Sequence, residues 1–327
     1  MITVLAGGVG AARLLRGMIR AVPAHEVTAI VNTADDLVLH GLSISPDLDT
    51  VTYTLAEAVN PETGWGLVGE TWQAMDALER LGGAAWFRLG DRDLGTHLHR
   101  TGRLADGAGL TEVTAEITRA FGINARLLPM TEDRVATMVT LSSNGVPTDG
   151  ATEMEIGFQD YFVGLRHDVP ISGVRFDGIN AARPAPGVLD AITSADTVVV
   201  APSNPIVSIG PVVAVPGVAK ALAARRDDVV AVSPIVAGSA LKGPAERMLR
   251  ELGHEPTVVG VARLYRDFAS TLVVDSADGE LVDAVEAEGM RCLVTPTVMT
   301  DVGVATDLCR TLLSLDRPAE SSARQPR

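Results

Sequence analysis

A glycine-rich turn near the amino terminus constrains the fold more than any other feature of the chain. The apolar, strand-like run Ile2–Leu5 precedes it, the turn spans Gly7–Gly10, and residues 11–21 have the composition of a helix. A strand, a tight glycine turn and a helix in this order are typical of the first unit of a parallel α/β sheet. Backbone N–H groups at the start of such a helix can bind a phosphate, so the turn also predicts an anion site. A tight turn that binds no ligand is the alternative.

The alternation of strands and helices continues along most of the chain. Further strands are expected at 27–32, 86–89, 197–201, 229–233, 271–275 and 291–295, and further helices near 50–59, 68–81, 111–121, 187–194, 216–225, 244–252, 278–289 and 301–315. Only 4% of the residues are aromatic, which indicates a core of small branched side chains packed between helices and strands. We therefore predict an α/β fold with a Rossmann-like, mostly parallel sheet and helices on both faces.

One region departs from this alternation. It contains short β-like runs at Ala136–Leu141 and Ile171–Phe176, and we interpret it as an inserted smaller subdomain. The carboxyl-terminal residues are rich in Pro, Ser and charge, which predicts a disordered tail. The predicted division is a first core part at 1–123, the insertion at 124–178, a second core part at 179–316 and the tail at 317–327.

Charge and composition exclude several classes of function. The formal net charge of -14 argues against a nucleic-acid-binding protein, which would present a basic stripe. Cys292 and Cys309 lack CxxC spacing, and the amino terminus lacks the features of a signal peptide, so a cytoplasmic protein is expected. Residues 197–219 carry no charge over the length of a membrane span, but four prolines interrupt them, so no membrane segment is expected.

Four carboxylates lie close to the glycine turn in the predicted topology. Asp35 and Asp36 end the second strand, and Asp47 and Asp49 lie at the start of a predicted helix. Oxygen ligands suit Mg²⁺, and an acidic chain must bind phosphates by local devices such as a metal ion. The cluster therefore predicts a metal site, with helix capping by Asp47 or Asp49 as the alternative.

An NAD(P)-dependent oxidoreductase remains an alternative function. Asp36 stands where such an enzyme places the acid that binds the adenosine ribose. However, the dinucleotide fingerprint would place its third glycine at position 13, where this chain has Arg13. Arg13 could instead bind a phosphate.

Three further loops follow predicted strands and would reach the same edge of the sheet. The first, Arg88–Asp93, is charged, and surface ion pairs explain it as well as a ligand does. His97 and His99 follow it, but no third ligand has zinc-like spacing, so no metal role is expected for them. The other two loops supply candidate contacts to a diphosphate or base, although ordinary turn chemistry explains them equally well: Ser203, Asn204, Ser208 and Lys242.

Together these segments resemble the 2-phospho-L-lactate transferase family, which transfers a phosphoester group to the deazaflavin FO during biosynthesis of coenzyme F-420. The resemblance spans roughly residues 1–315. It rests on the order and spacing of the Gly-Gly-x-Gly opening, Asn32–Asp36, Ile44–Thr50, Leu89–Asp93, Leu128–Met130, Pro202–Pro205, Ser208–Pro211 and Val232–Val236.

The resemblance implies a Mg²⁺-dependent transfer in a Rossmann-like homodimer. The terminal ribityl hydroxyl of FO would attack the phosphorus that bears the lactyl or enolpyruvyl group of a guanosine diphosphate-linked donor, and GMP would leave. The Ala- and Arg-rich composition is typical of a GC-rich bacterium. For actinobacterial members of the family the resemblance implies the enolpyruvyl group, so we expect dehydro coenzyme F-420-0 rather than F-420-0 as the product. A nucleotide-sensing protein of the same fold is a non-catalytic alternative.

The resemblance also assigns roles to residues of this chain. Asp49 and Arg88 would bind FO. We hypothesise that Asp36, Asp47 and Asp49 share metal binding and orientation of the hydroxyl, with Asp36 and Asp49 as the catalytic residues. The implied nucleotide contacts are the glycine turn (Gly7, Gly8 and Gly10) and the loop of Ser203 and Asn204, and the charges of Arg13 and Lys242 add these two residues to the predicted set.

Overall fold

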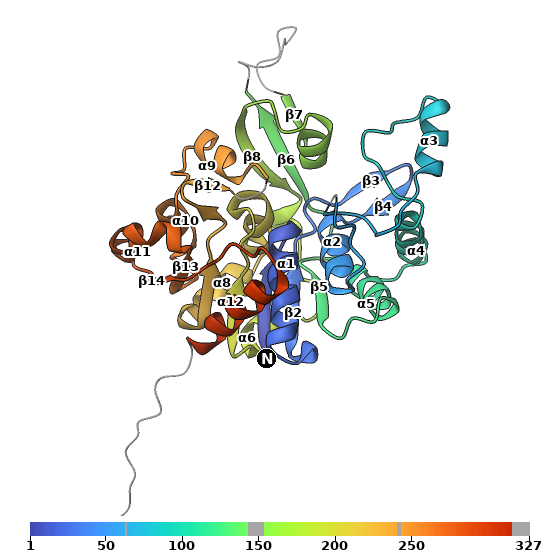
Figure 1. Cartoon of the computed structure of the whole chain (residues 1–327). Coiled ribbons are helices and arrows are strands. Elements are labelled where there is room, and N and C mark those ends of the chain that lie inside the picture. Colours follow the sequence, from blue (N-terminus) through green and yellow to red (C-terminus); the bar gives the residue numbers. More distant parts are fainter. Residues whose placement is uncertain (63, 143–153, 241–242, 316–327) are drawn as a thin grey trace, which may run out of the picture.

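A computed structural model describes residues 1–62, 64–142, 154–240 and 243–315 (Figure 1). Its centre is a seven-stranded sheet in the order β14-β13-β10-β9-β1-β2-β5, and each neighbouring pair of strands is parallel. The strands are β1 (Ile2–Ala6), β2 (Val27–Val31), β5 (Arg126–Pro129), β9 (Thr197–Val200), β10 (Val229–Val232), β13 (Thr271–Val274) and β14 (Arg291–Val294). The predicted parallel α/β sheet is confirmed.

Helices cover both faces of this sheet because its strands are apolar on both sides. In β9, for example, Val198 and Val200 pack into one core and Val199 into the other, as the alternation of side chains along a strand requires. One face is covered by α1 (Gly8–Ala21), α2 (Pro46–Leu55) and α12 (Val302–Ser314). The opposite face is covered by α6 (Val188–Ser194), α7 (Gly210–Ala214), α8 (Val218–Ala223), α9 (Ala245–Glu251), α10 (Val258–Tyr265) and α11 (Val282–Ala287).

Two smaller groups of elements extend from the central sheet. On the right of Figure 1, a hairpin of β3 (Leu37–Leu39) and β4 (Leu42–Ile44) packs with α3 (Gln73–Arg80) and α4 (Asp93–Ala105) around Ile44, Met75 and Leu89. At the top, an antiparallel sheet in the order β7-β6-β8 stands over the carboxyl edge of the central sheet. Its strands are β6 (Ala136–Leu141), β7 (Met154–Gly157) and β8 (Ile171–Asp177).

The remaining described elements are short. They are the helix α5 (Leu110–Ala120), the hairpin β11 (Ile235–Val236) with β12 (Ser239–Ala240), two π-helical turns at Asp160–Gly164 and Pro205–Ile209, and 3-10 turns at Ala24–Glu26, Ile179–Ala181, Arg226–Asp228 and Ser276–Leu281. None of the helices in the described ranges combines the length and the apolar character needed to cross a bilayer.

Several local expectations were wrong. Residues 86–89 form no strand, because only Leu89 in this run is buried and Arg88 is exposed beside Asp76. The predicted helix at 68–81 begins only at Gln73, and the predicted helix at 50–59 runs from Pro46 to Leu55. Three of the described helices, α4, α7 and α10, were not predicted. The α4 helix is polar and contains two glycines, α7 has only five residues and includes Pro211, and α10 is apolar on most sides and lacks a helical period.

The edge strand β5 also differs from the sequence prediction. Residues 126–129 fall within the range assigned to the insertion, yet they pair in parallel with β2 in the central sheet. The antiparallel sheet therefore begins only at Ala136. The division into domains otherwise stays a prediction, and the expected tail at 317–327 lies outside the described residues.

The packing of α8 gives a test of the core. Leu222 is fully buried against the central sheet, so we expect Leu222→Ala to lower the free energy of unfolding by about 2–5 kcal/mol. Leu81 is 85% exposed, and Leu81→Ala should change it by less than about 0.5 kcal/mol. Urea denaturation measures both values, and equal losses in the two variants would contradict this account of the core.

Candidate functional site

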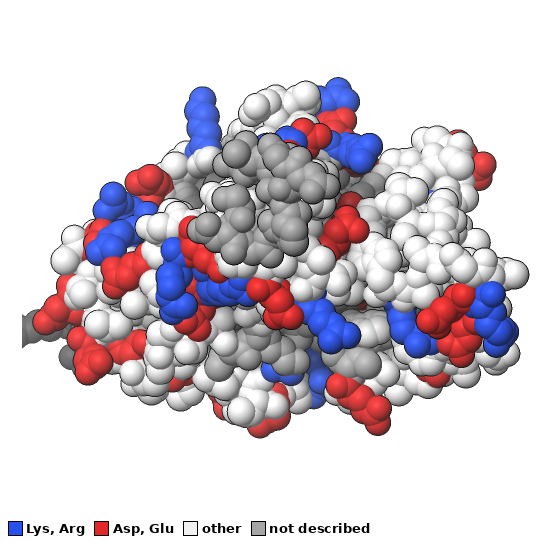
Figure 2. Space-filling view, turned by 90° about the horizontal axis from the view of Figure 1, so that it is seen from above, with Lys and Arg blue, Asp and Glu red and all other residues white. Residues whose placement is uncertain are grey.

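A cavity of about 1120 Å³ lies where the loops after the central strands meet. Gly7 follows β1, Asp35 follows β2, Pro202 follows β9 and Ser233 follows β10, and all four line it. This is the usual position of a ligand in an open parallel sheet, just beyond the carboxyl ends of the strands. Figure 2 looks down on this side of the molecule and shows acidic and basic side chains interspersed, without a continuous basic field. An anionic ligand would therefore depend on local groups inside the cavity.

The glycine turn borders the cavity and is in close contact with its neighbours. A Cβ atom on Gly10 would lie 2.4 Å from the Pro202 carbonyl oxygen, and one on Gly7 would lie 2.7 Å from Ser208 Cβ. Only glycine therefore fits at these two positions. The Ser203 hydroxyl donates a hydrogen bond of 2.7 Å to the Gly7 carbonyl and fixes the turn against the loop after β9.

The other predicted nucleotide contacts have different surroundings. Gly8 and Arg13 line the cavity, and Arg13 is exposed. Asn204 also lines it, but its Oδ1 accepts the Ile206 N–H at 2.9 Å and begins the π-helical turn. Lys242 lies outside the described residues. The structure thus brings most of this predicted set to one cavity, and their role in binding a nucleotide stays a prediction.

Two of the four carboxylates form a buried pair at the cavity. The Asn32 side-chain amide donates to Asp35 Oδ2 and to Asp47 Oδ2, each at 3.0 Å. Burial raises the pKa of Asp35 well above its ordinary value, and the neighbouring Asp47 charge raises it further. Burial likewise raises the pKa of Asp47, to about 6. Burial thus disfavours the charged form of both carboxyl groups, and a nearby cation would favour it, so the pair could hold a cation.

Asp36 lies behind this pair. Its Oδ2 accepts a hydrogen bond of 2.7 Å from the Ser45 hydroxyl, while its Oδ1 is buried without a donor from the described residues. Burial raises the pKa of Asp36 well above its ordinary value. Asp36 is not among the residues that line the cavity, so the structure does not place it in reach of a substrate there.

Asp49 has a cation of its own within the protein. Arg100, which is only 2% exposed, donates one hydrogen bond to each Asp49 oxygen, through Nη2 to Oδ1 and through Nη1 to Oδ2 at 3.1 Å. A bidentate pair of this kind neutralises the carboxylate and fixes its orientation. The predicted metal set of Asp36, Asp47 and Asp49 is not gathered into one group, and no three His, Cys, Asp or Glu side chains in the described ranges have the geometry of a metal site.

A polar network continues from Arg100 along α4. Its Nη1 lies 3.3 Å from His97 Nδ1, the His97 Nε2 lies 3.3 Å from Asp93 Oδ2, and the Tyr53 hydroxyl donates to Asp93 Oδ1 at 2.5 Å. The His97 Nε2 is nevertheless buried without a hydrogen-bond partner among the described residues. The cluster therefore consists of two hydrogen-bonded pairs, Tyr53 with Asp93 and Arg100 with Asp49, and Asp49 lines the cavity.

This network was missed at the sequence level. Asp93, His97 and Arg100 have the spacing i, i+4, i+7, which places them on one face of α4. Tyr53 stands four residues after Asp49 on α2 and lies on the same face of that helix. The spacing was readable from the sequence, but only once residues 93–105 were identified as a helix.

Aromatic side chains form another wall of the cavity. Trp65 and Trp86 come from the segment between α2 and α4, and Phe158 and Phe162 come from the segment after β7. The Phe158 and Phe162 rings are stacked at 5.5 Å between centroids. A Cβ atom on Gly164 would lie 3.7 Å from Trp86 Cε3, so the two segments meet at this point.

Arg88 reaches the cavity from a loop rather than from a strand end. Its guanidinium pairs with Asp76 at 2.6 Å and lies 5.1 Å from the centre of the Trp72 ring. Arg88 and Asp49 both line the cavity, as the resemblance implied for the acceptor site. Their contact with an acceptor stays a prediction.

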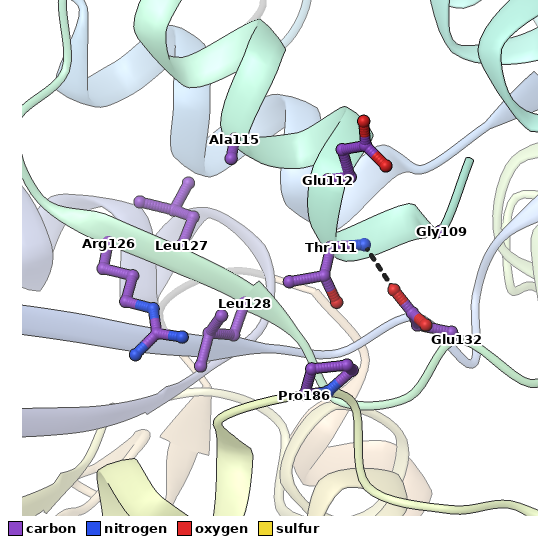
Figure 3. A pocket seen from close by; sticks show the side chains of 9 residues that line it. All are labelled: Gly109, Thr111, Glu112, Ala115, Arg126, Leu127, Leu128, Glu132 and Pro186. Atoms are coloured by element: carbon purple, nitrogen blue, oxygen red, sulfur yellow. Dashed lines mark hydrogen bonds between the residues drawn. The ribbon is translucent and has the colours of Figure 1, made fainter.

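A smaller cavity of about 430 Å³ lies between α5 and β5 (Figure 3). Its polar contact is between Glu132 Oε1 and the Thr111 N–H, at 2.9 Å. Glu132 thus satisfies a backbone donor in the first turn of α5, which explains its position without a ligand.

Comparison with known proteins identifies the family. Residues 2–302 match the family model described as 2-phospho-L-lactate transferase CofD. The chain belongs to the CofD family. It is 45% identical over 316 residues to a phosphoenolpyruvate transferase of Streptomyces griseus, covering 96% of this chain and 98% of that protein. It is 40% identical over 324 residues to a phosphoenolpyruvate transferase of Mycolicibacterium smegmatis, covering 96% and 98%.

A solved structure shares the fold of this CofD family member. A protein of the UPF0052 family from Bacillus halodurans superposes with a TM-score of 0.60 at 17% identity, covering 95% of this chain and 98% of that one. At this identity the likeness concerns the fold alone. Membership of the CofD family makes the chain a transferase enzyme.

The raised pKa of Asp47 makes stability depend on pH. The folded value of about 6 exceeds the ordinary 3.8, so the stability that this proton contributes is fully present below about pH 4 and is lost as the pH rises through about 6. Asp47→Asn cannot ionise, and we expect it to be more stable than the wild type at about pH 7.5, by up to about 3 kcal/mol. Urea denaturation at about pH 4 and pH 7.5 measures the free energy of unfolding of both proteins. A stability difference between the variant and the wild type that is the same at both pH values would contradict this prediction.

Proposed function

We propose that the protein transfers an enolpyruvyl-phosphate group from a guanosine diphosphate-linked donor to the terminal ribityl hydroxyl of FO. GMP leaves, and dehydro coenzyme F-420-0 is the product in coenzyme F-420 biosynthesis. The observation that carries this proposal is one cavity bordered by a glycine turn, a buried carboxylate pair and an aromatic wall. The names of the relatives favour the enolpyruvyl group, and the 2-phospholactyl group, giving F-420-0, is the second candidate.

The glycine turn would hold the diphosphate of the donor. The α1 helix begins at Gly8, whose N–H donates to Asp47, and the following N–H groups of the first turn have no partner within the helix. The partial positive charge at a helix start favours a phosphate there. Arg13, one turn further along, adds a full positive charge at the same cavity.

Asp35 and Asp47 fit a divalent cation better than the set predicted from the sequence. Both line the cavity, both are buried, and they share one amide donor. A bound Mg²⁺ would neutralise the charge of the diphosphate during displacement. Asp49 is left out of this set because Arg100 occupies both of its oxygens.

Asp49 would orient the acceptor hydroxyl. Each carboxylate oxygen accepts one hydrogen bond from Arg100 and keeps a further lone pair, and Asp49 lines the cavity. Accepting the hydroxyl proton there would aim the oxygen at the phosphorus. Trp65, Trp86 and Phe162 offer flat apolar surface for a deazaflavin ring.

These groups indicate which end of the cavity would hold the donor and which would hold the acceptor. The phosphate-binding turn belongs to the central sheet, whereas the aromatic wall comes from the two smaller groups of elements. The donor and the acceptor would therefore meet near the carboxylates that lie between them in this arrangement. A homodimer and a cytoplasmic location stay predictions from the sequence.

Product analysis tests the proposed function. The protein is incubated with FO, Mg²⁺ and either the enolpyruvyl or the lactyl guanosine donor, and the products are weighed by mass spectrometry. We expect GMP and dehydro coenzyme F-420-0 from the enolpyruvyl donor, and loss of turnover when EDTA removes the metal. Binding of GDP without turnover of FO would favour a nucleotide sensor. Binding of NADH without binding of FO would favour an oxidoreductase.

Replacement of Asp49 tests its role. We expect Asp49→Asn to lower kcat at least about 100-fold, because the hydroxyl loses its proton acceptor. The variant should also lose about 3–5 kcal/mol of stability, because the Arg100 charge is left buried without a carboxylate. Leu222→Ala is the matched control, since it loses similar stability away from the cavity. Wild-type turnover by Asp49→Asn, or an equal loss of turnover in Leu222→Ala, would contradict this role.

A further inference from the structure

Arg166, like Arg13, is a cationic side chain that lines the cavity without pairing with an acidic side chain of the described residues. Its side chain is exposed and lines the cavity, and it forms no hydrogen bond or ion pair with the described part of the chain. Arg88, by contrast, pairs with Asp76, and Arg100 pairs with Asp49. Neither the sequence motifs nor the roles proposed above account for Arg166.

The backbone at Arg166 adopts a conformation that side chains other than glycine rarely take. Arg166 has φ of 52° and His167 has φ of 45°, so two consecutive residues lie in the left-handed region. Such strain persists only where surrounding contacts impose it, and it is concentrated at functional sites. The turn that presents Arg166 is therefore held in place by its neighbours.

These neighbours are well defined. Arg247 donates hydrogen bonds to the carbonyl oxygens of His167 and Asp168, and its own position is fixed by Glu251 at 2.6 Å. The His167 N–H donates to the Tyr161 carbonyl at 2.9 Å. The His167 ring stacks on Phe162 at 5.1 Å between centroids. The backbone under Arg166 is thus fixed on both sides while its guanidinium stays available.

The turn that presents Arg166 lies beside the aromatic wall, on the side of the cavity assigned above to the acceptor, which the transferred end of the donor would face. Gly164, two residues earlier, meets Trp86 of the aromatic wall, where a Cβ atom would lie 3.7 Å from the indole. Phe162 and Gly164 line the cavity as well. The diphosphate has its own groups elsewhere, in the glycine turn and Arg13.

We propose that Arg166 binds the carboxylate of the group that is transferred and so selects donors that carry one. This inference rests on the proposed function. A guanidinium presents paired N–H donors in a plane, which matches the two oxygens of a carboxylate. The enolpyruvyl and the lactyl groups both carry a carboxylate beside the phosphorus, whereas GDP does not.

Steady-state kinetics of Arg166→Gln tests this inference. We expect the KM for the enolpyruvyl donor to rise roughly 10- to 100-fold, since a charged hydrogen-bonded contact is lost. The inhibition constant of GDP and the KM for FO should change less than about threefold. Arg166→Lys keeps the charge but not the planar fork, and it should recover part of the loss. Arg119→Gln, an exposed arginine on α5 that does not line the cavity, serves as the control and should match the wild type.

The outcomes separate this inference from the proposed function. An unchanged donor KM in Arg166→Gln, with an active wild type, overturns the role of Arg166 alone. An equal loss of affinity for the donor and for GDP assigns Arg166 to the diphosphate and also overturns it. A wild type that transfers neither group to FO overturns the proposed function, and the inference with it. Circular dichroism confirms that each variant is folded before it is measured.

Discussion

All seven strands of the central sheet run in one direction, and the rest of the structure depends on this constraint. Parallel strands need connections that cross one face of the sheet, so helices bury both faces and the strands become continuously apolar. Every loop that follows a strand then begins at the same edge. The glycine turn, the carboxylates after β2 and the loops after β9 and β10 meet there although Gly7 and Ser233 lie 226 residues apart in the chain.

The net charge of the chain does not describe the electrostatics at this edge of the sheet, which depend on the partner of each carboxylate. Asp35 and Asp47 are buried together around Asn32, and this burial raises their pKa values, so their charged form would need a cation that the described residues do not supply. Asp49, only two residues from Asp47, is instead neutralised by Arg100. Neighbouring carboxylates on one helix therefore differ in chemistry: one suits a metal ion and the other suits a hydroxyl group.

The two smaller groups of elements supply what the central sheet lacks. The sheet edge is made of glycines, carboxylates and hydroxyl groups, which suit a nucleotide but offer little apolar surface. Trp65 and Trp86 come from the segment between α2 and α4, and Phe162 and Arg166 come from the segment between β7 and β8. Gly164 and Trp86 both line the cavity, and a Cβ atom on Gly164 would lie 3.7 Å from the Trp86 ring, so these insertions together form one wall.

The sequence by itself determined the parallel α/β sheet, the glycine turn at its edge and part of the set of residues that line the cavity. These signals are local: apolar runs mark buried strands, and glycines mark a turn in which side chains do not fit. The failed strand at 86–89 and the missed helix α4 share a cause, because both segments mix charged and apolar residues without a clear period.

Only the tertiary structure decided which carboxylate is paired with which partner. Arg100 is 51 residues from Asp49 in the chain, and Asn32 is 15 residues from Asp47, so no local pattern relates them. Burial and the nearest opposite charge set the behaviour of a carboxyl group, and both depend on the packing of distant segments. The same reason kept the unpaired Arg166 from being recognised in the sequence.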